Sequence, residues 1–85
     1  MYSVVFSDEA KKSFAKLQKE EQSRIVSALG RCQIRPGHFL KRLVGHPYYR
    51  LRAGDERIII DICENRVLFV ITIEHRKKSY KRLPE

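Results

Sequence analysis

The stretch YYRLRAGDERIIIDICENRVLFVITIEHR, residues 48–76, decides the fold of this chain. Three runs within it alternate in polarity or are rich in β-branched residues, which is typical of β-strands. The pairs Gly54-Asp55 and Glu64-Asn65 separate the runs, and both are turn-forming residues at the length of a tight hairpin. The sequence therefore predicts an antiparallel meander of strands.

The two turns also predict which residues face one another. A two-residue loop at Gly54-Asp55 places Arg52 opposite Arg57, and one at Glu64-Asn65 places Arg57 opposite Thr72. Because side chains alternate with period two, one face of the sheet should be apolar, formed by Leu51, Ile58, Ile60, Ile62, Val67, Phe69, Ile71 and Ile73. The other face should carry Arg50, Arg52, Arg57, Ile59, Asp61, Leu68, Val70, Thr72, Glu74 and Arg76.

The arginines on that second face need a partner. Like charges directly opposite each other, as predicted for Arg52 and Arg57, destabilise a sheet. We infer that an anion balances them, and that the face which holds them is left open.

Residues before the meander predict one strand and two helices. YSVVF, residues 2–6, forms the strand, and Ser7 is a suitable N-cap for a helix that extends to about Gln18. A second helix is expected from about Glu20 to Cys32 or slightly beyond, with the inner-face residues Ile25, Ala28, Leu29 and Cys32. Pro36-Gly37 should end it.

These elements together predict the fold class. We expect an α+β protein in which two N-terminal helices pack on one face of a small, mainly antiparallel four-stranded sheet, in the order β-α-α-β-β-β. Residues 35–47 are expected to be a connector with Lys41 and Arg42 in solvent. A short helical turn is expected around residues 79–83, and the whole of 1–85 should be a single domain.

Charge and cysteine content narrow the class of protein. The chain of 85 residues has 18 Lys and Arg against 10 Asp and Glu, a net charge of +8, which suits a nucleic-acid binder or an acidic protein partner. Cys32 and Cys63 show no CxxC spacing, so we expect reduced thiols. No apolar run approaches the ~20 residues that span a bilayer, and no signal peptide is recognised, so we expect a soluble protein of the cytoplasm.

The sequence offers basic and aromatic side chains in place of a metal or cofactor motif. His38, His46 and His75 are scattered, without carboxylates at metal-ligand spacing, so we predict no metal site and no cofactor. A set of arginines, lysines, histidine and tyrosines suits binding and bond cleavage at a phosphodiester. A ribonuclease that works without metal needs a proton acceptor for the 2′-hydroxyl, positive charge for the phosphate and an acid for the leaving oxygen. Arginines supply the second role well but are poor at the others, because guanidinium scarcely deprotonates.

Groups next to Arg76 are the available proton carriers, namely His75, Lys77, Lys78 and Tyr80. A solvated basic tail is the simpler interpretation of this run, because charge runs are commonly no more than that.

The order of elements resembles the RelE/ParE toxin superfamily, most closely a compact archaeal-type RelE. The similarity covers nearly the whole chain: Lys41-Arg42-Leu43-Val44-Gly45 in the connector, then the YYRLRAGDERIIID hairpin, then a final strand that leads to HRKKSY. The hairpin and the ending are specific only in combination.

The resemblance implies roles for individual residues. In RelE-type toxins an open basic face holds the message, which is cut in the ribosomal A site by attack of the 2′-hydroxyl. By position, Arg50 and Arg52 match the paired basic residues on the second strand of those toxins. The residue that Arg52 matches is implicated there as a general base or in stabilising the phosphate. Arg57 matches a phosphate-binding arginine, and Arg76 matches an arginine that acts as acid or leaving-group stabiliser. Tyr80 resembles a C-terminal tyrosine that stacks on or orients the substrate. Both second-strand positions are arginine here, where lysines are often found.

RNA binding is expected of further basic residues, namely Lys41, Arg42, His75, Lys77 and Lys78. The implied partners are mRNA in the ribosomal A site and an antitoxin whose acidic or amphipathic segment wraps the domain. Two alternatives stay open: a ParE-type poison of DNA gyrase, and a non-enzymatic or decayed toxin that only binds an acidic partner.

Overall fold

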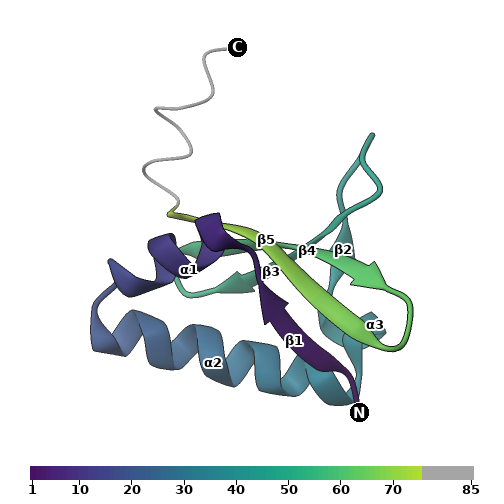
Figure 1. Ribbon diagram of the computed structural model, residues 1–85, viewed down its shortest axis with the longest axis horizontal. Coiled ribbons are helices and arrows are strands. Elements are labelled where there is room, and N and C mark those ends of the chain that lie inside the picture. Colours follow the sequence, from purple (N-terminus) through teal and green to yellow (C-terminus); the bar gives the residue numbers. More distant parts are fainter. Residues whose placement is uncertain (76–85) are drawn as a thin grey trace.

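Residues 1–75, which the computed structural model describes, form one sheet with helices against it. Three helices follow the first strand, β1 (Ser3–Phe6): α1 (Asp8–Ala15), α2 (Lys19–Ile34) and α3 (Pro36–Phe39). Four strands complete the fold: β2 (Lys41–Arg42), β3 (Tyr49–Ala53), β4 (Glu56–Cys63) and β5 (Val67–His75). Figure 1 shows α2 lying along one side of the sheet. The predicted α+β architecture is confirmed.

The sheet has five strands in the order β1-β5-β4-β3-β2, one more than predicted. β1 pairs in parallel with β5, and all other pairs are antiparallel. The additional strand, β2, is only two residues long, and two residues cannot show the alternation by which a strand is recognised. The helical turn predicted around residues 79–83 lies outside the described residues.

The β3–β4 hairpin has the predicted register. Arg52 lies opposite Arg57, Arg50 opposite Ile59 and Leu51 opposite Ile58. Gly54 has a φ of +64°, a conformation that glycine adopts without strain, so this turn is fixed at two residues. The apolar and basic residues of the hairpin are therefore on the predicted faces.

The predicted register between β4 and β5 is wrong. The connection has three residues, Glu64 to Arg66, because Cys63 pairs with Val67. Both Asn65 and Arg66 have positive φ, at 62° and 57°. The one-residue shift reverses the faces of β5 near the turn, since side chains alternate with period two. Leu68 and Val70, predicted on the open face, are fully buried, whereas Val67, Phe69 and Ile71 are only partly buried.

A bulge in β5 restores the predicted faces at its far end. Ile59 pairs with Thr72 and Ile60 with Val70, so the pairing skips Ile71. Beyond the bulge Ile58 lies opposite Ile73, and both are buried as predicted. Arg57 consequently lies opposite Glu74, and not opposite Thr72.

Ser7 joins the first helix to this bulge. Its hydroxyl accepts a hydrogen bond from the Ala10 amide at 3.0 Å, as an N-cap does, and donates one to the Ile71 carbonyl at 2.6 Å. The Ser7 amide also donates to the Val70 carbonyl at 2.9 Å. One serine thus begins α1 and satisfies the irregular backbone of β5.

The helix boundaries differ from the predicted ones for local reasons. α1 ends at Ala15, because Gln18 is the N-cap of α2 and forms a capping box with Glu21. α2 continues to Ile34, and Pro36 begins the short helix α3, since proline is favoured in the first turn of a helix.

The core lies between the helices and one face of the sheet. All four residues predicted on the inner face of the second helix are buried, namely Ile25, Ala28, Leu29 and Cys32. Phe14 of α1 packs edge-on against Phe6 of β1, with ring centroids 5.6 Å apart. The arginines of β3 and β4 alternate with the core residues and therefore lie on the other face.

Candidate nucleic-acid interface

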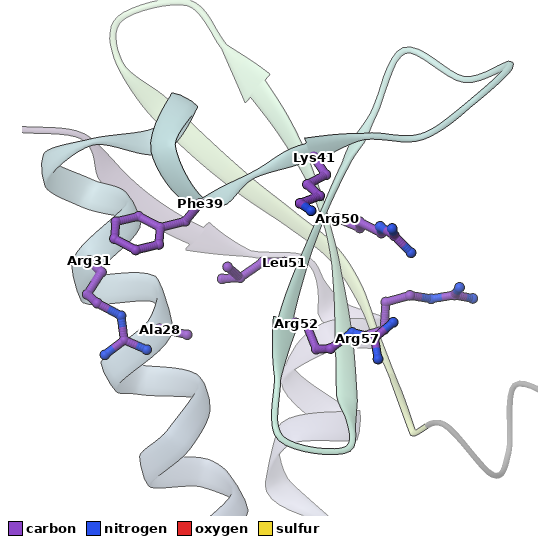
Figure 2. Close-up of a pocket in the computed structure, with 8 residues that line it drawn as sticks. All are labelled: Ala28, Arg31, Phe39, Lys41, Arg50, Leu51, Arg52 and Arg57. Carbon is purple, nitrogen blue, oxygen red and sulfur yellow. The ribbon is translucent and has the colours of Figure 1, made fainter.

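A cavity of about 380 Å³ lies along β3, and basic side chains from four elements line it. The cations are Arg31 of α2, Lys41 of β2, Arg50 and Arg52 of β3, and Arg57 of β4. Figure 2 shows Leu51 pointing from β3 toward α2, while Arg50 extends from the other side of the strand. The structure therefore brings together Arg50, Arg52, Arg57 and Lys41, four of the residues singled out from the sequence. We call the cavity lined by these four residues and Arg31 the arginine cavity.

The sheet fixes the spacing of the arginines. Arg50 and Arg52 are two residues apart on β3 and share a face, and Arg57 is the cross-strand partner of Arg52. Lys41 is the cross-strand partner of Arg50. Because these positions follow from backbone pairing, the convergence of charge does not depend on flexible loops.

Arg57 is partly neutralised within the chain. Its Nη2 atom forms an ion pair with Oε1 of Glu74 at 2.7 Å, and both side chains are about a quarter to a third exposed, at 33% and 26%. Its Nε atom is buried and has no hydrogen-bond partner in the described part of the chain. Glu74 therefore orients Arg57 and leaves one of its donors unused.

Arg50 and Arg52 have no carboxylate partner among residues 1–75. Arg52 is exposed and Arg50 is half-buried. Two guanidiniums held side by side without a counter-charge favour the binding of an anion, and the planar donors of arginine suit the oxygens of a phosphate.

Arg31 was not identified from the sequence. It follows Ala28 by three residues on α2, so it lies beside the buried face of that helix, and its guanidinium sits 5.9 Å from the ring centroid of Phe39. Its position three residues after Ala28, on the inner face of α2, is the sequence feature that could have identified Arg31. Phe39 belongs to α3, which was not predicted, so the contact itself could not be foreseen.

The other predicted residues lie apart from the cavity or outside the described residues. Arg42 is exposed on β2, with its guanidinium 5.9 Å from the Tyr49 ring centroid. His75 points at Glu56, which is buried on the helix-covered face, so it does not face the arginines. Four predicted residues lie outside the part of the chain that the structure describes, namely Arg76, Lys77, Lys78 and Tyr80.

In residues 1–75 no helix is long and apolar enough to cross a membrane.

Comparisons with known proteins identify the family. The family model for the ParE toxin of type II toxin–antitoxin systems, parDE, matches residues 4–80. No curated protein matches the chain.

Solved structures of RelE proteins share the fold. The structure of the intact E. coli RelBE toxin–antitoxin complex matches with a TM-score of 0.75 and 23% identity, covering 88% of this chain and 96% of that chain. The RelB–RelE antitoxin–toxin complex from Methanococcus jannaschii matches with a TM-score of 0.72 and 24% identity, over 94% and 99%. The RelE–RelB complex from Pyrococcus horikoshii OT3 matches with 0.74 and 23%, over 88% and 94%. The chain belongs to the ParE toxin family of type II toxin–antitoxin systems, within the RelE/ParE superfamily.

Proposed function

We propose that the protein is a toxin that cleaves mRNA in the ribosomal A site, in the cytoplasm, and so inhibits translation. The arginine cavity is the observation that supports this function, because it combines five cations in one concave site. A scissile phosphate gains negative charge as the 2′-hydroxyl attacks it, and cations already held in place stabilise that charge without reorganisation.

Individual roles follow from position in the cavity. Arg52 and Arg57, opposite each other on β3 and β4, would contact the non-bridging oxygens of the phosphate, and Arg50 would add charge beside them. Arg76 would stabilise the leaving oxygen and Tyr80 would orient the substrate. These arginines would stabilise charge and would not serve as the general base, because guanidinium is a weak proton acceptor.

Cleavage at this site would proceed without a metal ion. The residues that line the cavity include neither a carboxylate nor an imidazole, and the nearby Glu74 carboxylate pairs with Arg57, so in the described chain the cavity offers no cluster of the ligands that Mg²⁺ or Zn²⁺ prefers. The 2′-hydroxyl oxygen would form the new bond to phosphorus as the bond to the 5′-oxygen breaks. The products would be a 2′,3′-cyclic phosphate and a 5′-hydroxyl.

Neighbouring basic residues would hold the RNA backbone. Lys41 lines the cavity, and Arg42 is exposed next to it on β2. Lys77 and Lys78 are proposed for the same role. His75 remains a prediction for this role, although its side chain faces Glu56.

An antitoxin would neutralise the toxin by covering the arginines. The E. coli and Methanococcus jannaschii RelE structures described above were determined as complexes with RelB. A net charge of +8, together with Arg50 and Arg52, which have no carboxylate partner within residues 1–75, favours a partner with an acidic or amphipathic segment.

Cleavage of mRNA with and without programmed ribosomes tests the proposal. With ribosomes that present an empty A site, we expect cuts in phase with codons, and the upstream fragments should carry a 2′,3′-cyclic phosphate. Free mRNA should be cut poorly, because the chain offers no strong base of its own. Upstream fragments with a 3′-hydroxyl, or equal cutting of free mRNA, would contradict the proposal.

Poisoning of DNA gyrase is the second candidate, because the matching family model is that of ParE toxins. A supercoiling assay with purified gyrase separates the two. Loss of supercoiling together with intact mRNA on ribosomes would support the gyrase function and exclude the ribonuclease.

A further inference from the structure

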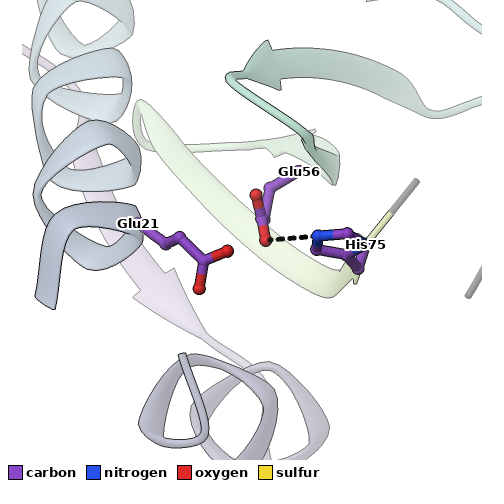
Figure 3. Close-up of side chains that lie close together, drawn as sticks. All are labelled: Glu21, Glu56 and His75. Carbon is purple, nitrogen blue, oxygen red and sulfur yellow. Dashed lines mark ion pairs between the residues drawn. The ribbon is translucent and has the colours of Figure 1, made fainter. Parts of the chain in front are cut away.

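Three side chains from distant parts of the sequence meet on the helix-covered face of the sheet. They are Glu21 in the first turn of α2, Glu56 at the start of β4 and His75 at the end of β5. One ligand atom from each lies within 4.8 Å of the other two, and Figure 3 shows the carboxylate of Glu56 between the other side chains. No pair of these residues is closer than 19 positions in sequence, so no spacing motif could identify them.

Glu56 is the unusual member of the group. Its side chain is 1% exposed, and Oε2 has no hydrogen-bond partner in the described residues. The nearest cation is the imidazole of His75, whose Nε2 lies 3.8 Å from that oxygen, too far for a hydrogen bond. A buried carboxylate needs compensation, and one partly exposed histidine at this distance supplies little.

The surroundings of Glu56 add negative charge. Burial is the main reason that the pKa of Glu56 is raised, and the charges of Glu21 and Asp55 and a side-chain hydrogen bond with Glu21 raise it further, whereas His75 acts in the opposite direction. In a chain with a net charge of +8, acidic groups thus converge at one place. A bound cation would compensate both carboxylates at once.

We propose that Glu21, Glu56 and His75 bind one divalent transition-metal ion of the Zn²⁺ class. An imidazole nitrogen with two carboxylates suits Zn²⁺, whereas Mg²⁺ and Ca²⁺ prefer oxygen ligands alone. In tetrahedral coordination at the usual Zn²⁺ distances, ligand atoms lie roughly 3.3 Å apart, so the three side chains must move together slightly.

The side chains are placed to allow that movement. Glu21 and His75 are partly exposed, so an ion has access from solvent and both side chains have room to adjust. One oxygen of Glu21 accepts a hydrogen bond from the Gln18 amide at 3.1 Å, which leaves the other for a metal. Water would complete the coordination.

The role of this ion would be structural. It would link the start of α2 to the ends of β4 and β5, on the face opposite Arg50, Arg52 and Arg57. The metal site shares only His75 with the proposed ribonuclease function, and each proposal can fail without the other.

Metal titration of the full chain, stripped with a chelator and free of affinity tags, tests the site. We expect one Zn²⁺ per chain by equilibrium dialysis and a higher Tm with Zn²⁺. Mg²⁺ at the same concentration should leave the Tm unchanged. Absence of Zn²⁺ binding, or an equal Tm shift with Mg²⁺, would overturn the proposal.

Matched variants locate the ion. Glu56→Gln and His75→Ala should each weaken Zn²⁺ binding by about tenfold or more, because each removes a direct ligand. Glu20→Gln and His46→Ala, which change neighbouring or exposed residues of the same types, should bind Zn²⁺ as the wild type does. If Glu56→Gln does not fold, Glu21→Gln decides, because glutamine still accepts the capping hydrogen bond. Unchanged binding in the ligand variants that fold would show an adventitious ion only.

Discussion

At the scale of single residues, burial separates side chains that look alike in the sequence. Leu68 and Val67 are adjacent aliphatic residues of β5, yet Leu68 is fully buried and Val67 only partly so. The difference comes from the three-residue turn that precedes them, which sets the register with β4.

Replacing Leu68 with alanine tests this register. We expect Leu68→Ala to lower the free energy of unfolding by about 2–5 kcal/mol, because it leaves a cavity in the core. Val67→Ala is the matched control and should cost less than about 1.5 kcal/mol. Urea denaturation measures both. A larger loss in Val67→Ala would favour the two-residue turn.

The two cysteines should differ in reactivity. Cys32 is fully buried, so reagent does not reach its thiol, and burial also raises the pKa of that thiol. Desolvation and the neighbouring Asp61 raise the pKa of Cys63 as well, so access and not pKa decides the difference. Cys63 is exposed. Mass spectrometry after brief alkylation of the native protein should find label on Cys63 alone, and on both after denaturation. Equal labelling of native Cys32 would mean that α2 does not pack as described.

At the scale of elements, the sequence predicts those contacts that local chemistry determines. The β3–β4 hairpin was predicted residue by residue, because Gly54 specifies a two-residue turn. The residues Cys63 to Arg66 do not specify the length of the next turn. In the structure this turn has three residues, and both Asn65 and Arg66 adopt positive φ. The carbonyl of Ile71, the residue skipped at the bulge, accepts a hydrogen bond from Ser7, far away in the chain.

The candidate site and the acidic cluster also combine contacts that local sequence determines with contacts that only tertiary packing creates. Arg50, Arg52 and Arg57 were predicted to share a face because pairing within one hairpin places them there. Alternation along β4 also places Glu56 on the face of Ile58 and Ile60, so the sequence alone places this carboxylate among core residues. Its approach to Glu21 and His75 depends on tertiary packing, which a single sequence does not reveal.

Ser7 connects two elements, and two substitutions separate its roles. Ser7→Ala should cost about 1–2 kcal/mol, because it removes both the N-cap and the hydrogen bond to the Ile71 carbonyl. Ser7→Asp keeps the cap but cannot donate to that carbonyl, so its stability should fall between alanine and wild type. Thermal unfolding measures the series. If the aspartate variant is as stable as the wild type, the hydrogen bond from Ser7 to the Ile71 carbonyl does not stabilise the fold.

At the scale of the whole molecule, charge is distributed by face. The net charge is +8, and Lys41 of β2, Arg50 and Arg52 of β3 and Arg57 of β4 line one cavity. The acidic cluster of Glu21 and Glu56 lies on the helix-covered side. The fold thus presents its positive potential on the open face of the sheet, where a polyanion has access.

Salt dependence of RNA binding tests this distribution. Binding of a short single-stranded RNA should weaken as salt increases, with a slope in log affinity against log salt of about −0.7 for each phosphate contacted. Removing Arg50 by Arg50→Ala should reduce the slope by roughly that amount. Fluorescence anisotropy measures both slopes. An unchanged slope in Arg50→Ala would mean that Arg50 does not contact a phosphate of the RNA.

The most direct test of the central claim is the rate of mRNA cleavage on programmed ribosomes by Arg52→Ala. Arg35→Ala, which removes an exposed arginine outside the cavity, is the matched control, and both variants should retain the wild-type Tm. If the arginine cavity holds the scissile phosphate, Arg52→Ala should cleave about a hundredfold more slowly, as loss of one charge-stabilising donor predicts, while Arg35→Ala cleaves at the wild-type rate. Cleavage by folded Arg52→Ala at the wild-type rate would contradict the account.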